Sequence, residues 1–357
     1  NYFQMNTEIF PPDRIGADIL NEFILESLSA MKLPEDTAKL LADSLIQADL
    51  WGHPSHGIMR LFWYGERIKS GAIQCLKEPE WVIDAGGIAT LDGMDGVGQS
   101  IAAIAMQTAI QKAKIYGIAA ISVRNSGHFG TAMYFTKMAA DANCIGFLSS
   151  NASPAMAPWG GIETLVGNNP WSWAAPAGRY PCFMLDIANT AVARGKLYHA
   201  KKTGQAIPEG WALDEHGNMT TDPVAGIAGQ ILPMAGHKGY AISMAMDVLS
   251  GVLSAGQFGS SISGPYKKEG KSGAGHLIIV IDITKIRPIK EFCEDMESLI
   301  TSLKASKLAP GSSEIYYPGE KEAKNHEIAS DIGILISKSV QHELAYGAKL
   351  LGIKHPF

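Results

Sequence analysis

The chain has 357 residues, of which 46% are hydrophobic and 18% are charged. This balance is typical of a globular protein with a well-buried core, and the length suggests roughly two or three domains. The net charge is −5 and no basic block is present, so we do not expect nucleic-acid binding. No apolar run approaches the ~18 residues that a membrane-spanning helix needs.

Cysteine usage and the start of the chain bear on the cellular compartment. The four cysteines are far apart and form no C-x-x-C pair, which favours free thiols in a reducing environment. No basic segment followed by an apolar one marks a signal peptide. We therefore expect a cytoplasmic protein. Residues 1–4, before the first methionine, look like the remnant of a cleaved tag.

The first part of the chain predicts a small helical unit. Apolar residues recur at helical spacing over residues 11–31 and again over residues 34–50. Pro34 and the two acids after it are typical of a first helical turn. The pattern breaks at residues 52–54, and a third helix is predicted over residues 55–69.

The start of this third helix carries a candidate site. Ser55 is placed as a helix N-cap, and His56 and Arg60 are four residues apart, so on a helix they share one face. A histidine beside an arginine is unfavourable unless an anion lies between them, and the planar fork of arginine fits a carboxylate. Alternatively, Arg60 pairs with a surface acid. His53 and His56 have no third ligand nearby, so we predict no metal site.

A second candidate lies in residues 121–130. A short apolar strand ends there in a polar, glycine-rich loop that contains His128, and a helix follows over residues 131–142. Loops on a rigid support are common places for chemistry, and histidine exchanges protons near neutral pH. The alternative is a structural histidine at a turn.

The pattern Gly96-x-Gly98, between a predicted strand and a predicted helix, invites comparison with a dinucleotide-binding loop. The third glycine of that fingerprint is absent, because Ile101 occupies its place, and no acid follows at the required distance. We interpret the segment as a tight turn. Strands and helices also mix without a regular βαβ alternation, which argues against a doubly wound sheet.

Two further charged residues stand at the ends of predicted elements. Asp186 ends the apolar strand 183–187, where it either caps a turn, orients a histidine or holds a ribose hydroxyl. Lys238 lies between Gly236 and Gly239 near the start of a long helix. A cation at that position is suited to a phosphate, although an ordinary exposed lysine is the alternative.

Taken together, these motifs resemble one family. The chain is similar to the type-2 malate/L-lactate dehydrogenases, also called L-sulfolactate dehydrogenase-like proteins, which include ureidoglycolate dehydrogenase, 2,3-diketogulonate reductase and piperideine-2-carboxylate reductase. The resemblance covers nearly the whole chain from about residue 8. It rests on six segments in order: 55–61, 124–130, 169–176, 193–196, 236–240 and 317–320.

The resemblance implies an α+β fold without a Rossmann domain. A helical domain from both chain ends, residues 1–118 completed by 288–357, would serve substrate binding and dimerisation. An α/β domain with a largely antiparallel sheet, residues 119–287, would bind NAD or NADP. The absence of a clear basic cluster for a 2′-phosphate favours NAD. The partner is another copy of the chain, in a homodimer.

The resemblance also implies roles for residues. His56, or in some members the histidine that matches His128, is the acid/base, and Ser55 and Asp186 act with His56 as a relay. Arg60 grips the substrate carboxylate. The segments that match cofactor contacts supply Asp186, Ile187 and Ala188, then His237 and Lys238, and then Pro318, Gly319 and Glu320.

We therefore predict a dehydrogenase that interconverts a small 2-hydroxy acid and its 2-keto acid by hydride transfer. Alternatives within the enzymes are reduction of a cyclic imino acid or of a sugar-derived diketo acid. A hydrolase with Ser55, His56 and Asp186 as a triad is a different class, weakened by the adjacency of Ser55 and His56 and the absence of a nucleophile elbow. A catalytically silent ligand-binding protein is the remaining alternative.

Overall fold

The structure is a computed structural model that describes residues 13–357. The expected tag remnant at residues 1–4 and the start of the first predicted helix lie outside this part. Its two largest hydrophobic cores are formed by different sets of residues. One lies among helices from both chain ends, and the other lies between a seven-stranded sheet and the helices that cover one of its faces.

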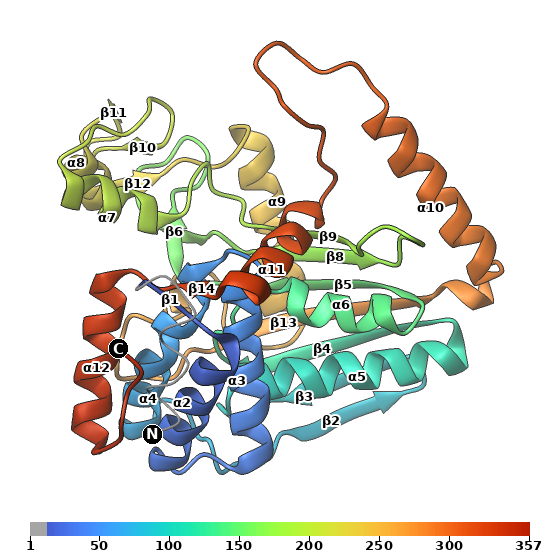
Figure 1. Cartoon of the computed structure of the whole chain (residues 1–357), viewed down its shortest axis with the longest axis horizontal. Helices are drawn as coiled ribbons and strands as arrows, with labels where there is room; N and C mark the ends of the chain where they lie inside the picture. The colour runs from blue at the N-terminus through green and yellow to red at the C-terminus, as the bar shows by residue number, and fades with distance from the viewer. Residues whose placement is uncertain (1–12) are drawn as a thin grey trace.

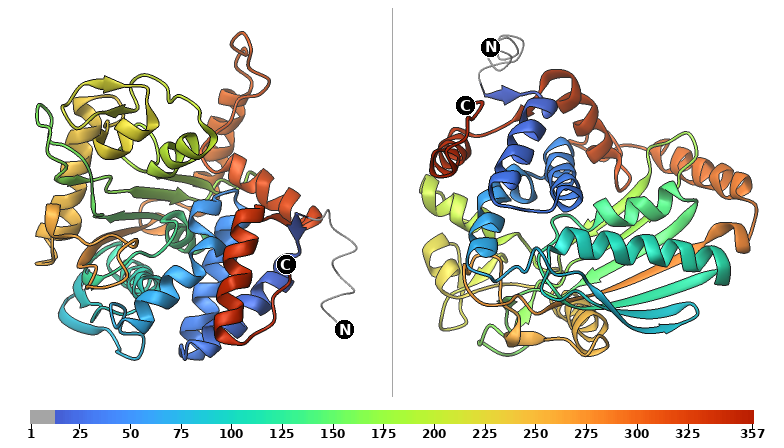
Figure 2. Two further views of the ribbon diagram at one scale, coloured as in Figure 1. Left: turned by 90° about the vertical axis from the view of Figure 1, so that its left-hand side faces the viewer. Right: turned by 90° about the horizontal axis from the view of Figure 1, so that it is seen from below.

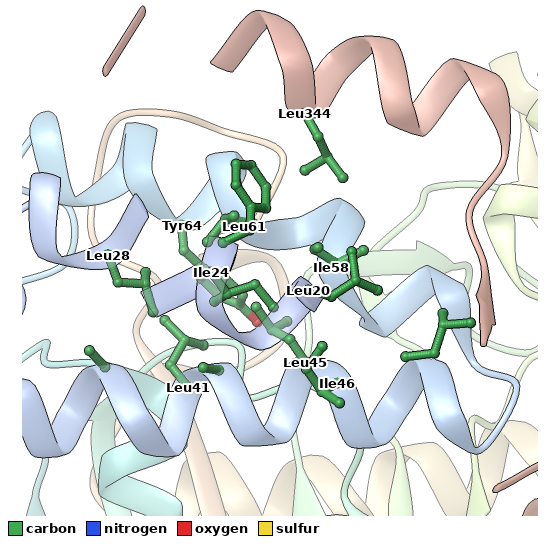
Figure 3. Packing of buried hydrophobic residues seen from close by; sticks show 14 of the residues in the cluster. Leu20, Ile24, Leu28, Leu41, Leu45, Ile46, Ile58, Leu61, Tyr64 and Leu344 are labelled. Atoms are coloured by element: carbon green, nitrogen blue, oxygen red, sulfur yellow. The ribbon is translucent and has the colours of Figure 1, made fainter. Parts of the chain in front are cut away.

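The helical unit joins the two ends of the chain. Leu20, Phe23 and Leu28 of the first helix are fully buried, at the spacing seen in the sequence, and each stabilises the fold by about 1.5–3 kcal/mol. Leu344 from the last helix enters the same core (Figure 3). The elements of this unit are β1 (Arg14–Ile15), α2 (Ala17–Ala30), α3 (Glu35–Leu50), α4 (Leu61–Lys69), α11 (Glu320–Ile332), β14 (Ile334–Leu335) and α12 (Lys338–Leu351).

The predicted third helix, residues 55–69, is wrong in its first turn. Two short 3₁₀ turns, η1 (Pro54–His56) and η2 (Ile58–Arg60), precede α4. Gly57 between them is extended, with φ −90° and ψ −151°, so the helical ladder cannot pass through it. His56 and Arg60 therefore do not share the face of one helix, and their proximity comes from the fold of this loop.

The sheet is mixed and mostly antiparallel. Its strand order is β2-β3-β4-β13-β5-β8-β9, in which β3 and β4 pair in parallel and the other neighbours pair antiparallel. The strands are β2 (Glu80–Ala85), β3 (Ile88–Asp92), β4 (Ile118–Ser126), β5 (Cys144–Ser150), β8 (Trp171–Ala175), β9 (Phe183–Ile187) and β13 (Ala274–Asp282). The predicted mixture of helices with a largely antiparallel sheet is confirmed.

The central strand β13 is covered on both faces, which explains its nearly continuous apolar sequence. Helices α5 (Gly98–Tyr116) and α6 (Met133–Asp141) lie along one face, and α9 (His237–Asp247) with the π turn η3 (Val248–Val252) packs on the other (Figures 1 and 2). Strands β2 and β3 belong to this sheet although they precede residue 119. The division of the chain at residue 118 stays a prediction.

Smaller elements surround the sheet. One group, with its own core, is α7 (Arg194–Thr203), β10 (Ala212–Leu213), β11 (Met219–Thr220), α8 (Pro223–Ala228) and β12 (Gln230–Ile231). The others are β6 (Pro154–Met156), β7 (Val166–Gly167), η4 (Gly259–Ser261), η5 (Ile283–Lys285) and α10 (Ile289–Lys304), which reaches away from the body in Figure 1. Within residues 13–357, no helix is both long and apolar enough to cross a membrane.

Candidate active site

Asp49 of α3 supports the loop that carries Ser55, His56 and Arg60. The buried Asp49 carboxylate accepts the Ile58 N–H at 2.7 Å. A Cβ at Gly57 would lie 2.0 Å from Asp49 Oδ1, so only glycine lets the loop settle on this carboxylate. Burial raises the pKa of Asp49 to about 7, and the Ile58 N–H lowers it in part.

The structure brings the two candidate histidines together. The His56 and His128 rings stack with centroids 5.5 Å apart and an interplanar angle of 19°. His128 follows β4 in the loop before α6, as predicted. Gly98 packs against this loop: a Cβ there would lie 2.5 Å from the carbonyl oxygen of His128. The absence of a side chain at Gly98 therefore allows α5 to approach the His128 backbone closely.

Arg60 lies buried beside the pair. Its Nε donates to the Ser55 carbonyl at 2.7 Å, and its guanidinium carbon lies 4.2 Å from the centroid of Trp63 and 5.3 Å from that of Tyr266. One terminal nitrogen of Arg60 is buried and has no hydrogen-bond partner among residues 13–357. Because a buried guanidinium with an unpaired N–H is costly, this nitrogen is ready for an anion.

The surroundings keep both imidazoles neutral at neutral pH. Burial lowers the pKa of His56 to about 4, and the positive charge of Arg60 acts in the same direction. Burial, and then Arg60 and His56, hold the pKa of His128 well below its usual value. Ser55 Oγ lies 2.9 Å from His56 Nδ1, so these two side chains are in hydrogen-bond contact, and their part in a relay stays a prediction.

Asp186 lies at the end of β9, as predicted, but its hydrogen bond goes to another partner. Its Oδ2 accepts the Met133 N–H at 2.9 Å, at the start of α6, where a carboxylate is favoured by the helix dipole. Burial raises the pKa of Asp186 to about 6, and the Met133 N–H and His53 lower it in part. Among the described residues Asp186 has no hydrogen bond to His56, so its part in a relay stays a prediction.

The three segments predicted to contact the cofactor meet along β9. The Met184 N–H donates to the Pro318 carbonyl at 3.1 Å, which places residues 318–320 beside the strand that leads to Asp186, Ile187 and Ala188. The Met234 N–H donates to the Asn189 carbonyl at 2.9 Å, just before the turn into α9 with its first residues His237 and Lys238. Glu320 is buried in an ion pair with Lys304, Nζ to Oε1 2.5 Å.

Comparison with known proteins agrees with this architecture. Residues 15–345 match the family model described as malate/L-lactate dehydrogenase. The chain belongs to this family. It is 38% identical to the malate dehydrogenase of Pyrococcus horikoshii over 96% of both chains, and 34% identical to the ureidoglycolate dehydrogenase (NAD(+)) of Escherichia coli K12 over 93% of this chain and 95% of the other.

A solved structure extends the match to the fold. The sulfolactate dehydrogenase from Methanocaldococcus jannaschii superimposes with a TM-score of 0.90 at 35% identity, covering 96% of this chain and 98% of that chain. The predicted membership of the malate/L-lactate dehydrogenase family is confirmed. So is the predicted class of enzyme, a hydroxy-acid dehydrogenase that uses NAD or NADP.

Several side chains in this malate/L-lactate dehydrogenase site were not singled out from the sequence. Tyr64 contacts the His128 ring, Gln99 donates to the Tyr64 hydroxyl, and Asp49 supports the His56 loop. His276 on β13 is fully buried between Ser126 and Ser150, with ring nitrogens 2.8 and 3.0 Å from their hydroxyls. Only the spacing of Tyr64 from Arg60, one helical turn, could have drawn attention to any of them.

We find no candidate metal site in the part of the chain that the structure describes. Residues 13–357 contain no group of three or more His, Cys, Asp or Glu side chains that could hold a metal ion. His53 instead contacts Glu322 of α11, Nε2 to Oε1 3.3 Å.

Proposed function

We propose that His56, His128 and Arg60 bind and reduce a small 2-keto acid, or oxidise the matching 2-hydroxy acid. The observation that carries this proposal is the buried, unpaired nitrogen of Arg60 beside two stacked histidines. A substrate carboxylate at Arg60 would satisfy that nitrogen and orient the neighbouring carbonyl toward the imidazoles. Trp63 and Tyr266, whose ring centroids lie 4.9 Å apart, both pack against the guanidinium and restrict its orientation.

The residues along β9 suit a nicotinamide dinucleotide. Lys238 is exposed in the first turn of the 11-residue helix α9, where a phosphate is favoured by the N-terminal dipole and by the lysine charge. Residues 186–188 end β9 on the side of this helix, and residues 318–320 lie beside Met184 near the start of the strand. When bound, the nicotinamide supplies the hydride, and the protein supplies orientation and the proton. Because no basic cluster for a 2′-phosphate is evident, we propose NAD as the preferred cofactor.

The same proposal covers the place of the cofactor on the fold and the oligomeric state. The cofactor lies on the mostly antiparallel sheet without a Rossmann fingerprint, since Gly98 packs against the His128 loop and leaves no room there for a phosphate. The chain forms a homodimer, whose mass light scattering would measure directly.

The decisive assay follows NADH and NADPH absorbance with a panel of substrates: pyruvate, oxaloacetate, a sulfonated keto acid, a sugar-derived diketo acid and a cyclic imine. Turnover of a keto acid is expected, with NADH preferred. Turnover of the cyclic imine alone would show that the enzyme reduces an imino acid rather than a keto acid. Failure of every substrate with both cofactors would overturn the proposal.

Variants of Arg60 then test the carboxylate site on the best substrate. Arg60→Met should lower kcat/KM roughly 100-fold or more, because two charge-assisted hydrogen bonds of about 1.5–3 kcal/mol each are lost. Arg60→Lys should recover only part of this loss, since an ammonium lacks the planar fork. Arg179→Met, which removes an exposed arginine paired with Glu297, is the matched control and should keep full activity.

A further inference from the structure

Two buried residues outside the predicted site form a hydrogen-bonded chain that ends on His128. The Tyr64 hydroxyl lies 2.7 Å from His128 Nδ1, and Gln99 Nε2 donates to that hydroxyl at 2.9 Å. Gln99 is fully buried and Tyr64 is 4% exposed. The Tyr64 ring belongs to the core of the helical unit (Figure 3), so the position of its hydroxyl is fixed by packing.

A backbone N–H determines which way the hydrogen bonds between Gln99, Tyr64 and His128 run. The Gly130 N–H also points at His128 Nδ1, with a nitrogen-to-nitrogen distance of 3.4 Å. A backbone N–H only donates, so Nδ1 must carry the lone pair. In a neutral ring the proton then sits on Nε2. Consequently the Tyr64 hydroxyl donates to Nδ1, and its own lone pair accepts from Gln99.

The surroundings of His128 favour the neutral ring that these hydrogen bonds require. Burial acts against a second proton on the ring, and the positive charges of Arg60 and Arg67 act in the same direction. His128 Nε2 has no hydrogen-bond partner among residues 13–357. A neutral imidazole with a free N–H can polarise a carbonyl oxygen and stabilise the charge that develops on it.

We propose that Gln99 and Tyr64 form a relay that fixes His128 as a neutral Nε2–H donor to the substrate oxygen. Gln99 and Tyr64 are positioning residues, and His128 donates a hydrogen bond without giving up its proton. His56 then handles the proton: on oxidation its neutral ring accepts the proton of the hydroxy acid, and on reduction the protonated ring returns that proton to the oxygen. This inference rests on the proposed function for its catalytic meaning, whereas the state of the His128 ring is a property of the free protein.

Nitrogen NMR of protein labelled at histidine measures that state directly. The signals of His128 are assigned as those lost in His128→Asn. In the free wild-type protein at pH 8 we expect Nδ1 to resonate as an unprotonated nitrogen and Nε2 as a protonated one. A proton on Nδ1 would overturn the inference.

Gln99→Glu tests the relay by reversing it. The introduced carboxylate has nearly the same shape but only accepts at pH 8, so the Tyr64 hydroxyl must turn toward it. His128 can then keep its bond to Tyr64 only by carrying the proton on Nδ1. We expect the tautomer to reverse and kcat to fall on the order of 100-fold with little change in KM, as for loss of one donor to a developing oxyanion. An unchanged tautomer would overturn the relay.

Two further variants separate the relay from general damage to the fold. Gln230→Glu makes the same change at a buried glutamine whose Oε1 accepts the Ala157 N–H, and the His128 tautomer should stay as in wild type. In a Tyr64→Phe background, Gln99→Glu should no longer reverse the tautomer, because the connecting hydroxyl is gone. A reversal there would show that the charge acts without Tyr64 and would refute the relay.

The failures of the two proposals are distinguishable. If the wild-type protein turns over no substrate but shows Nε2–H on His128, with reversal in Gln99→Glu, the proposed function fails and the relay stands. If the protein reduces a keto acid but His128 carries its proton on Nδ1, the relay fails and the proposed function stands.

Discussion

The contact between Gly57 and Asp49 makes a strong prediction about how the His56 loop is supported. A Cβ at Gly57 would lie 2.0–2.3 Å from all three carboxyl atoms of Asp49, so Gly57→Ala must displace that side chain. The Ile58 N–H then loses its acceptor, which costs about 1–3 kcal/mol for a buried donor, and the displaced carboxylate adds strain. We expect a loss of about 2–4 kcal/mol in unfolding free energy.

A double-mutant cycle isolates this contact. The φ of Gly57, −90°, lies outside the left-handed region that favours glycine, so steric overlap with Asp49 is the main obstacle to a side chain. In an Asp49→Ala background the overlap is gone, and Gly57→Ala should be neutral or stabilising by up to about 1 kcal/mol through reduced chain entropy. The expected coupling energy is therefore about 2–4 kcal/mol.

Urea unfolding at pH 8, followed by tryptophan fluorescence and by circular dichroism, measures each corner of the cycle. Gly195→Ala is the matched control, because a Cβ there meets no atom within 4 Å in α7, and the change should be neutral or slightly stabilising. Equal costs of Gly57→Ala with and without Asp49 would refute the reasoning, since the carboxylate would then not be what excludes the side chain.

Three further predictions concern other parts of the site. Because the pKa of Asp49 is raised to about 7, the folded protein binds more protons there than the unfolded chain between about pH 4 and 7, so this group's contribution to unfolding free energy falls as pH rises. Asp49→Asn should flatten that part of the stability–pH curve measured by urea unfolding; an unchanged slope would contradict the pKa shift. Arg67 donates to the carbonyls of Lys267 and Gly270, so Arg67→Met should speed limited proteolysis between residues 264 and 271, and equal cleavage rates would show that other contacts hold this loop. Gly319 has φ 97°, and a Cβ there would lie 2.5 Å from the carbonyl oxygen of Cys182, just before β9. Gly319→Ala should therefore lower the melting temperature and weaken NADH binding. An unchanged melting temperature and unchanged NADH binding would show that the start of α11 can shift freely.

Local sequence determined the elements that depend on local forces. The apolar spacing of α2 and α3 and the polar loop after β4 were predicted, since the pattern of apolar residues reports which face of an element is buried. Motif spacing also identified the family, because Ser55, His56, Arg60 and His128 each lie in a short segment that can be recognised without knowing its neighbours.

Only the tertiary structure decided which of these residues meet. Tyr64 and His128 are 64 residues apart, and Gln99 is 35 residues from Tyr64, so no local pattern places them on one chain of hydrogen bonds. The break at Gly57 was missed for the same reason, since the Asp49 carboxylate that shapes it comes from a different helix. Side-chain partners across a fold depend on how whole elements pack, and packing is a property of the complete chain rather than of any window of it.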